Sequence, residues 1–196
     1  MKVLLINPPD QYSRKGPKHY PLGLGYLATT LSRRGESCEV LDLASGKTLL
    51  VDKLRSYQPD VVGISVYSTT MPDVQKLLAT LKQEFREHTI AGGPHATLFP
   101  EEMVREGFDF VVSGEGEETL PDLLEHIDDP STVRGITFND NGAIVSTPKR
   151  ESIQNLDELA FPDRQLFDVS VYEKNIVMGA RGCSYGCRCL SALVYF

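Results

Sequence analysis

Three of the four cysteines in this 196-residue chain lie close together near its C-terminus, at Cys183, Cys187 and Cys189. Glycines and the two arginines Arg181 and Arg188 flank them. Thiolates spaced this closely are not typical of scattered core residues, and they predict a shared metal ion or metal cluster. A structural zinc ion would need a fourth ligand, and C-x3-C-x-C is not a usual zinc spacing.

Four further segments with polar or glycine-rich sequences each follow a predicted strand. Paired glycines at a strand end allow a ligand or another backbone to approach closely, and hydroxyl groups both donate and accept hydrogen bonds. Because the carboxyl ends of parallel strands share one edge of a sheet, these segments predict one ligand-binding edge. The candidate binding residues are Asn7, Pro8, Pro9, Ser65, Tyr67, Ser68, Thr69, Gly92, Gly93, Pro94, His95, Gly114, Glu115, Gly116 and Glu117.

Short apolar runs alternate with stretches of helical periodicity, and these elements would position the binding segments. The predicted strands are Val3–Ile6, Ser37–Leu43, Val61–Val66, Thr89–Ala91 and Phe108–Val112. The predicted helices are Leu22–Arg33, Lys47–Tyr57, Pro72–Glu87, Pro100–Glu106 and Glu117–Ile127. Nearly continuous apolar strands indicate a parallel sheet that is covered on both faces. The expected fold is α/β, with a five-stranded parallel sheet in the flavodoxin-like, doubly wound, Rossmann-like arrangement.

The pattern changes after residue 130. Asp140-Asn141-Gly142 separates the segments Gly135–Asn139 and Ala143–Thr147, which predicts a β-hairpin. A polar linker follows, and Ile176–Met178 is expected to be a further strand that leads into the cysteines. We therefore expect three parts: a ligand-binding domain at 1–130, a hairpin and linker at 131–175, and the incomplete start of a second domain at 176–196.

Composition and charge exclude several classes of protein. The net charge of −7, with no stretch that concentrates Lys and Arg, argues against a nucleic-acid-binding surface. The N-terminal apolar run ends at Pro8 and reads as a buried strand, and no run approaches the roughly 18 apolar residues of a membrane span. We expect a cytoplasmic protein, in which close-set cysteines bind metal or perform redox chemistry.

A possible nucleotide motif lies in the first predicted helix. Gly23-Leu24-Gly25-Tyr26-Leu27-Ala28 matches the fingerprint G-x-G-x-x-A, and Asp42 follows at about the spacing of a ribose-binding acid. The fingerprint requires its glycines directly after the first strand, whereas a long loop from Asn7 to Pro21 intervenes here. This spacing argues against pyrophosphate binding at the strand–helix turn. A flavodoxin-like nucleotide- or flavin-binding protein nevertheless stays an open alternative.

A series of motifs occurs in order along the chain: Leu4–Pro9, Pro21–Ala28, Pro59–Ser65, Gly92–Thr97, Gly114–Glu117, Leu156–Leu159, Pro162–Arg164 and Arg181–Cys183. Together they resemble the N-terminal part of a cobalamin-dependent radical S-adenosylmethionine enzyme of the methyltransferase or cyclase type. The resemblance implies that residues 1–130 bind cobalamin through the four strand-end segments. It also implies that the cysteine segment belongs to a [4Fe–4S] site that binds S-adenosylmethionine.

Two positions depart from the patterns of these enzymes. Radical S-adenosylmethionine enzymes carry C-x3-C-x2-C, but here Leu190 stands at the third cysteine position and Cys189 comes one residue early. The better-known cobalamin motif D-x-H-x-x-G has a cobalt-binding histidine where this chain has Tyr12 after Asp10. The resemblance therefore implies a cobalt ion without a histidine ligand.

The length of the chain sets a further expectation. The catalytic barrel of such an enzyme would need on the order of 200 more residues. We expect a cobalamin-binding module that is inactive alone and that depends on a radical S-adenosylmethionine barrel in cis or a catalytic chain in trans. A stand-alone corrinoid carrier is the alternative.

Overall fold

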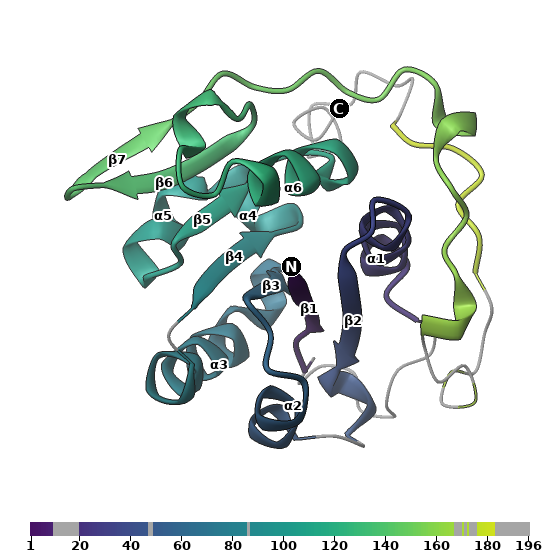
Figure 1. Cartoon of the computed structure of the whole chain (residues 1–196), viewed down its shortest axis with the longest axis horizontal. Coiled ribbons are helices and arrows are strands. Elements are labelled where there is room, and N and C mark those ends of the chain that lie inside the picture. The colour runs from purple at the N-terminus through teal and green to yellow at the C-terminus, as the bar shows by residue number, and fades with distance from the viewer. Residues whose placement is uncertain are drawn as a thin grey trace.

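The computed structural model describes residues 1–9, 20–46, 49–85, 87–166, 170, 172 and 176–182. Their strands form a seven-stranded sheet in the order β2-β1-β3-β4-β5-β6-β7 (Figure 1). The strands are β1 (Lys2–Asn7), β2 (Ser37–Asp42), β3 (Val61–Ser65), β4 (His88–Gly92), β5 (Phe110–Val112), β6 (Ile136–Asp140) and β7 (Ala143–Ser146). The strands from β1 to β5 run parallel in the order 2-1-3-4-5, which is the predicted flavodoxin-like order.

Helices cover both faces of the sheet, as a doubly wound fold requires. They are α1 (Leu22–Arg33), α2 (Leu50–Tyr57), α3 (Met71–Glu84), α4 (Pro94–Leu98), α5 (Pro100–Glu106) and α6 (Gly116–Glu125). On one face Leu31 of α1 and Leu123 of α6 enter a common core. On the other face Leu54 of α2, Leu81 of α3 and Met103 of α5 enter a second core. Because both faces are buried, the central strands are apolar along nearly their whole length.

The predicted hairpin is present, and it extends the same sheet. Strand β6 pairs antiparallel with β5, with Phe138 opposite Phe110, and β7 pairs antiparallel with β6. Asn141 and Gly142 both have positive φ angles, 49° and 94°, as a two-residue hairpin turn demands. The sheet therefore has seven strands rather than the predicted five, because the buried face of the hairpin, including Ile136, continues the core.

Several element boundaries differ from the sequence predictions. Helices α1 and α5 have the predicted bounds, but α3 ends at Glu84 because Phe85 adopts an extended conformation with φ −141° and ψ 134°. The segment after Gly93, for which the sequence predicted no helix, forms the short helix α4. The prediction of a strand at Ile176–Met178 was wrong, because these residues have no strand partner in the described sheet.

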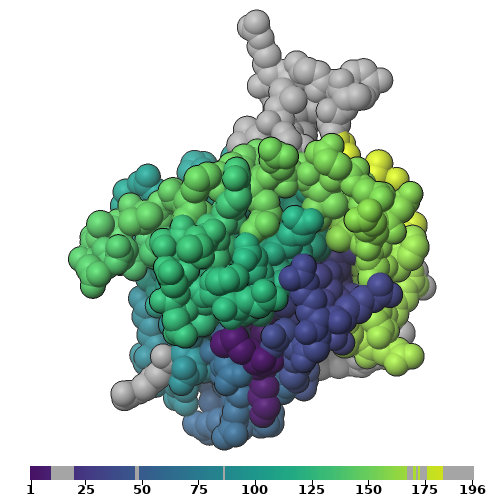
Figure 2. Space-filling model, turned by 45° about the horizontal axis from the view of Figure 1, so that its top comes forward, coloured from purple at the N-terminus to yellow at the C-terminus, as the bar shows by residue number. Residues whose placement is uncertain are grey.

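The segment after the hairpin returns along the sheet edge toward α1. In Figure 2 it runs in light green and yellow beside the dark blue of α1. The backbone N–H of Asp163 donates a hydrogen bond of 2.8 Å to Thr29 Oγ1 of α1, which fixes this path. Among the described residues, no helix combines the length and apolar character needed to cross a bilayer.

Candidate functional site

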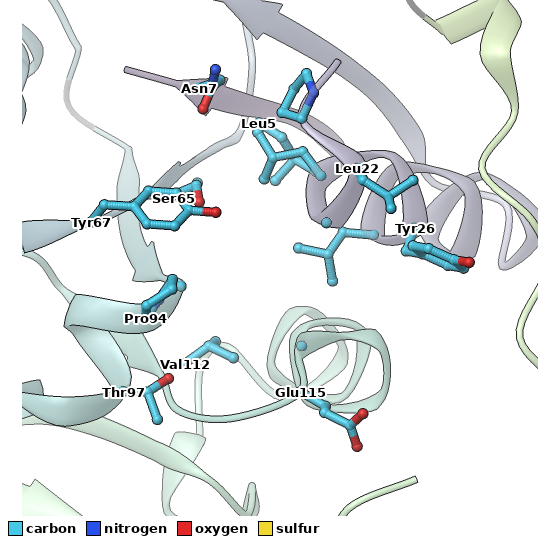
Figure 3. A pocket seen from close by; sticks show the side chains of 18 of the residues that line it. Leu5, Asn7, Leu22, Tyr26, Ser65, Tyr67, Pro94, Thr97, Val112 and Glu115 are labelled. Atoms are coloured by element: carbon cyan, nitrogen blue, oxygen red, sulfur yellow. The ribbon is translucent and has the colours of Figure 1, made fainter. Parts of the chain in front are cut away.

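A cavity of about 910 Å³ opens at the carboxyl edge of the parallel strands, between α1 and α6 (Figure 3). This volume lies at the upper end of the range for ligand sites in proteins, about 300–1,000 Å³. Its floor and walls are apolar, with residues from four strands and both helices: Leu5, Gly63, Ile90, Val112, Leu24, Leu27 and Leu120. The cavity thus reaches from the strand ends down onto the face of the sheet.

Gly63 creates the space over the middle of the sheet. A Cβ atom at this position would lie 2.9 Å from Leu5 Cδ2, a separation too short for two carbon atoms. The neighbouring side chains on this face, Leu5 and Ile90, are buried in the core beneath α1 and α6. A glycine in the interior of a strand weakens the strand, and it often marks a place where another group approaches the backbone.

Most of the predicted binding residues line this cavity. They are Asn7, Pro8, Ser65, Tyr67, Thr69, Gly92, Gly93, Pro94, Gly114, Glu115, Gly116 and Glu117. Tyr67 is 47% exposed, and Figure 3 shows its ring directed into the open space beside Ser65. The rim is therefore polar where the floor is apolar.

Three predicted residues do not line the cavity: Pro9, Ser68 and His95. His95 lies in α4 and is buried, with Nδ1 at 2.9 Å from Ser68 Oγ and its ring 5.0 Å from that of Phe99. Its Nε2 has no hydrogen-bond partner, and the nearest carboxylate oxygen, on Glu102, is 3.6 Å away. His95 therefore fixes the loop after β3 from outside the cavity.

The two glycines after β4 have different functions. Gly93 has a φ angle of 92°, and a Cβ atom there would lie 3.1 Å from Ser65 Oγ and from both N and O of Val66. A Cβ atom on Gly92 would meet only the carbonyl oxygen of Val112, at 4.0 Å. Gly93 is thus required for contact between the β3 and β4 loops. Of these two glycines, only Gly92 has free space at the cavity.

A network of hydrogen bonds surrounds Asp42 at the carboxyl end of β2, beside the cavity. Asp42, at the end of β2, accepts hydrogen bonds from Asn7 Nδ2 at 2.9 Å, from the backbone N–H of Ala44 at 3.0 Å and from Tyr172 OH at 2.8 Å. Asp42 is buried and fully engaged with protein groups. It therefore does not present a free carboxylate to a ribose, as the nucleotide motif would require, and Gly23 lies inside α1 rather than in a strand–helix turn.

Glu115 and Glu117, at the start of α6, bind an arginine from the far end of the described chain. Arg181 donates to Glu115 Oε1 at 2.8 Å and also to Glu117 Oε1, and its guanidinium lies 5.2 Å from the ring centre of Tyr26. Burial lowers the pKa of Arg181, but the hydrogen bonds to both carboxylates outweigh this effect and raise it. The arginine is therefore charged while it lies largely buried.

Residues 176–182, which we call the strap, form one wall of the cavity. Ile176, Met178, Ala180, Arg181 and Gly182 line it. The carbonyl of Ile176 accepts a hydrogen bond of 2.9 Å from Tyr20 OH. Neither the strap nor the α1 residues of the wall were predicted as site residues. The α1 residues lie in the motif Pro21–Ala28, but no local pattern indicates that the strap returns to the sheet.

The predicted metal ligands Cys183, Cys187 and Cys189 lie outside the described residues, as do Asp10 and Tyr12. Within the described part of the chain, no group of three or more His, Cys, Asp or Glu side chains could hold a metal ion. The fourth cysteine, Cys38, is buried in the core, and burial, together with the charge of Glu39, raises its pKa to about 12.

Comparison with known proteins gives three kinds of match. A family model described as "B12 binding domain" matches residues 14–124. An uncharacterized methyltransferase of Pyrococcus horikoshii is 32% identical over 214 residues, which cover 100% of this chain and 46% of that protein. The anaerobic magnesium-protoporphyrin IX monomethyl ester cyclase of Synechocystis sp. is 28% identical over 207 residues, 95% of this chain and 41% of that protein.

A solved structure shows the same fold. The radical S-adenosylmethionine methyltransferase TsrM from Kitasatospora setae, with cobalamin and a [4Fe–4S] cluster bound, aligns with a TM-score of 0.64 and 24% identity. The match covers 76% of this chain and 31% of that chain.

The chain spans less than half the length of these relatives. The family model, in contrast, covers more than half of this chain, from residue 14 to residue 124. That range contains α1, β3, β4, β5 and the start of α6, which frame the cavity. The chain therefore belongs to the B12-binding domain family.

Proposed function

We propose that the cavity between α1 and α6 binds a corrinoid, and that the chain is the cobalamin-binding module of a B12-dependent radical S-adenosylmethionine enzyme. The observation that carries this proposal is the combination of a deep apolar floor with a polar rim at the carboxyl edge of the sheet. A cobalamin has a matching polarity, because its corrin ring bears amide groups around its edge and its nucleotide tail ends in a flat aromatic base.

The residues of the site fit such a ligand. Amide groups of the ring would find hydrogen-bonding partners at Asn7, Ser65 and Thr69 on the rim. The aromatic base would fit the apolar floor over Gly63, where the missing side chain leaves the sheet open. Gly92 would allow the ligand to approach the backbone at the end of β4.

The contribution of this module would be binding and orientation. A bound cobalamin supplies a cobalt centre that can carry a methyl group. The residues of this chain would hold the ring edge by hydrogen bonds and exclude water from the apolar floor. Methyl transfer and ring closure are the reaction classes that the relatives' names indicate.

The full-length enzyme would carry further cofactors. The three thiolates of Cys183, Cys187 and Cys189 would belong to the [4Fe–4S] site that binds S-adenosylmethionine, as the family resemblance implies. The radical S-adenosylmethionine barrel would follow in cis, since the relatives are more than twice as long as this chain. A catalytic chain in trans would serve the same purpose.

A titration tests the proposal. The chain should bind hydroxocobalamin with a change in the visible spectrum of the corrinoid, and it should bind neither FMN nor NAD. Gly23 lines the cavity, and a Cβ atom there would meet no atom within 4 Å. A Gly23→Phe side chain should therefore occupy part of the cavity and weaken corrinoid binding by about tenfold or more.

Gly23→Ala is the matched control, because a methyl group leaves most of the cavity open at the same position of α1. It should bind hydroxocobalamin as the unchanged chain does. Binding of FMN in place of hydroxocobalamin would reject the proposal, and equal corrinoid affinity in Gly23→Phe and Gly23→Ala would place the ligand elsewhere.

A further inference from the structure

The strap is attached to the start of α6 by a largely buried cluster of three charges. The exposed fractions of the side chains are 12% for Arg181, 11% for Glu115 and 6% for Glu117. The two carboxylates lie at the N-terminus of a ten-residue helix, where the helix dipole favours negative charge. Arg181 is therefore required to balance two carboxylates that water reaches poorly.

The geometry suits arginine better than lysine. One guanidinium N–H group binds each carboxylate, and the guanidinium carbon lies over the ring of Tyr26 of α1. A planar donor with several N–H groups can bridge two acceptors and lie over an aromatic ring at the same time, whereas an ammonium group acts as a point charge. The cluster thus joins three segments: the strap, α1 and the β5–α6 loop.

Glu115 also fixes the linker. Its Oε2 accepts a hydrogen bond of 2.6 Å from the backbone N–H of Ile153. The carboxylates of the segment Gly114–Glu117, which the sequence suggested as direct ligand contacts, are thus occupied by protein groups. In this structure they hold the chain that follows the domain against the cavity.

The strap lines the cavity and directly precedes the cysteine segment in the sequence. Its residues line the cavity, so a ligand there touches the strap directly. Arg181 stands two residues before Cys183 in the sequence. One short stretch of backbone therefore links the cavity to the start of the cysteine segment.

We propose that Arg181, held by Glu115 and Glu117, is a positioning residue that couples corrinoid binding to the attachment of the strap to α6. We call this attachment the seating of the strap. The proposal rests on the corrinoid function proposed above. Because coupling is reciprocal, a seated strap should tighten corrinoid binding, and bound corrinoid should keep the strap seated. The cluster would in this way set the start of the cysteine segment at the mouth of the cavity.

Proteolysis of the chain measures the seating of the strap. Val177 and Met178 are exposed, and thermolysin cleaves before such residues once the backbone around them is released. Arg181→Gln should increase the rate of cleavage within residues 176–182, identified by the masses of the fragments, by about tenfold. Saturating hydroxocobalamin should slow this cleavage in the unchanged chain and have little effect in Arg181→Gln.

Corrinoid affinity gives the second measurement. Arg181→Gln should bind hydroxocobalamin about tenfold more weakly. In the unchanged chain the Arg181 guanidinium binds two protein carboxylates, so this loss would come from the strap rather than from a direct contact with the ligand. Arg181→Lys, which keeps the charge but cannot bridge both carboxylates, should fall between Arg181→Gln and the unchanged chain.

Arg150→Gln is the matched control. Arg150 also forms ion pairs with α6, at Asp122 and Glu118, but it lies outside the cavity and the strap. It should leave both the cleavage within the strap and the corrinoid affinity unchanged.

The outcomes separate the two proposals. Failure of the unchanged chain to bind hydroxocobalamin would reject the corrinoid function, while cleavage without corrinoid would still measure the seating of the strap. If the chain binds corrinoid, equal affinity in Arg181→Gln would overturn the coupling, whether or not the strap is cut faster.

Discussion

At the scale of single residues, the site depends on where side chains are absent as much as on where they are present. Gly63 opens the floor of the cavity and Gly93 allows two loops to touch, whereas Gly92 has room for a side chain. The same residue type thus opens a cavity at one position and allows backbone packing at another. Only the distances around each glycine distinguish these functions.

Alanine substitutions should separate the two glycines after β4. Gly93→Ala should lower the free energy of unfolding by about 2 kcal/mol, because the residue has a positive φ angle and its new Cβ atom would crowd Val66. Gly92→Ala should change it by no more than about 0.5 kcal/mol. Urea unfolding of both variants measures the difference, and equal losses would contradict it.

The cobalt ion is predicted to have no histidine ligand from the protein. Among the described residues, no histidine lines the cavity, and His95 is bound to Ser68 outside it. The electron paramagnetic resonance spectrum of the Co(II) form should therefore show no nitrogen splitting from a protein histidine. A nitrogen triplet that disappears in His19→Ala or His95→Ala would show that a histidine binds cobalt after all.

At the scale of elements, the hairpin extends the core of the parallel domain. Val133, Ile136 and Phe138 belong to the same buried cluster as residues of α1 and α6. The ring of Phe138 lies 6.3 Å from that of Phe110 on the neighbouring strand. The hairpin therefore contributes to the core of the sheet, although the sequence pattern changes after residue 130.

Truncation of one side chain tests the contribution of the hairpin. Phe138→Ala should lower the free energy of unfolding by about 3 kcal/mol, since it leaves a cavity beside Phe110 in the buried cluster. Lys149→Ala, at an exposed position just after the hairpin, should have an effect of no more than about 0.5 kcal/mol. Similar unfolding midpoints for the two variants would mean that the hairpin does not stabilise the domain.

At the scale of the whole molecule, distant parts of the chain meet at one edge of the sheet. The strap contacts Tyr20, which lies just before α1, and it reaches α6 through Glu115 and Glu117. Tyr172 reaches Asp42 at the end of β2. The chain that leaves the domain thus crosses the mouth of the cavity before it enters the cysteine segment.

This polypeptide alone is predicted not to cleave S-adenosylmethionine. Its thiolates have the spacing C-x3-C-x-C rather than C-x3-C-x2-C, and its 196 residues span less than half the length of the relatives. After anaerobic reconstitution with iron and sulfide, reduction by dithionite should yield no 5′-deoxyadenosine. Catalytic formation of 5′-deoxyadenosine would show that Cys183, Cys187 and Cys189 suffice.

The sequence by itself determined the parallel sheet and most of the ligand-binding edge. Apolar strands and helical periodicity are local patterns, and the carboxyl ends of parallel strands must meet, so Asn7, Ser65, Gly92 and Gly114 could be placed together in advance. Only the tertiary structure showed that the cavity descends over Gly63, that His95 turns away from it and that Arg181 binds Glu115 and Glu117. These features depend on contacts between residues distant in sequence, which no local pattern encodes.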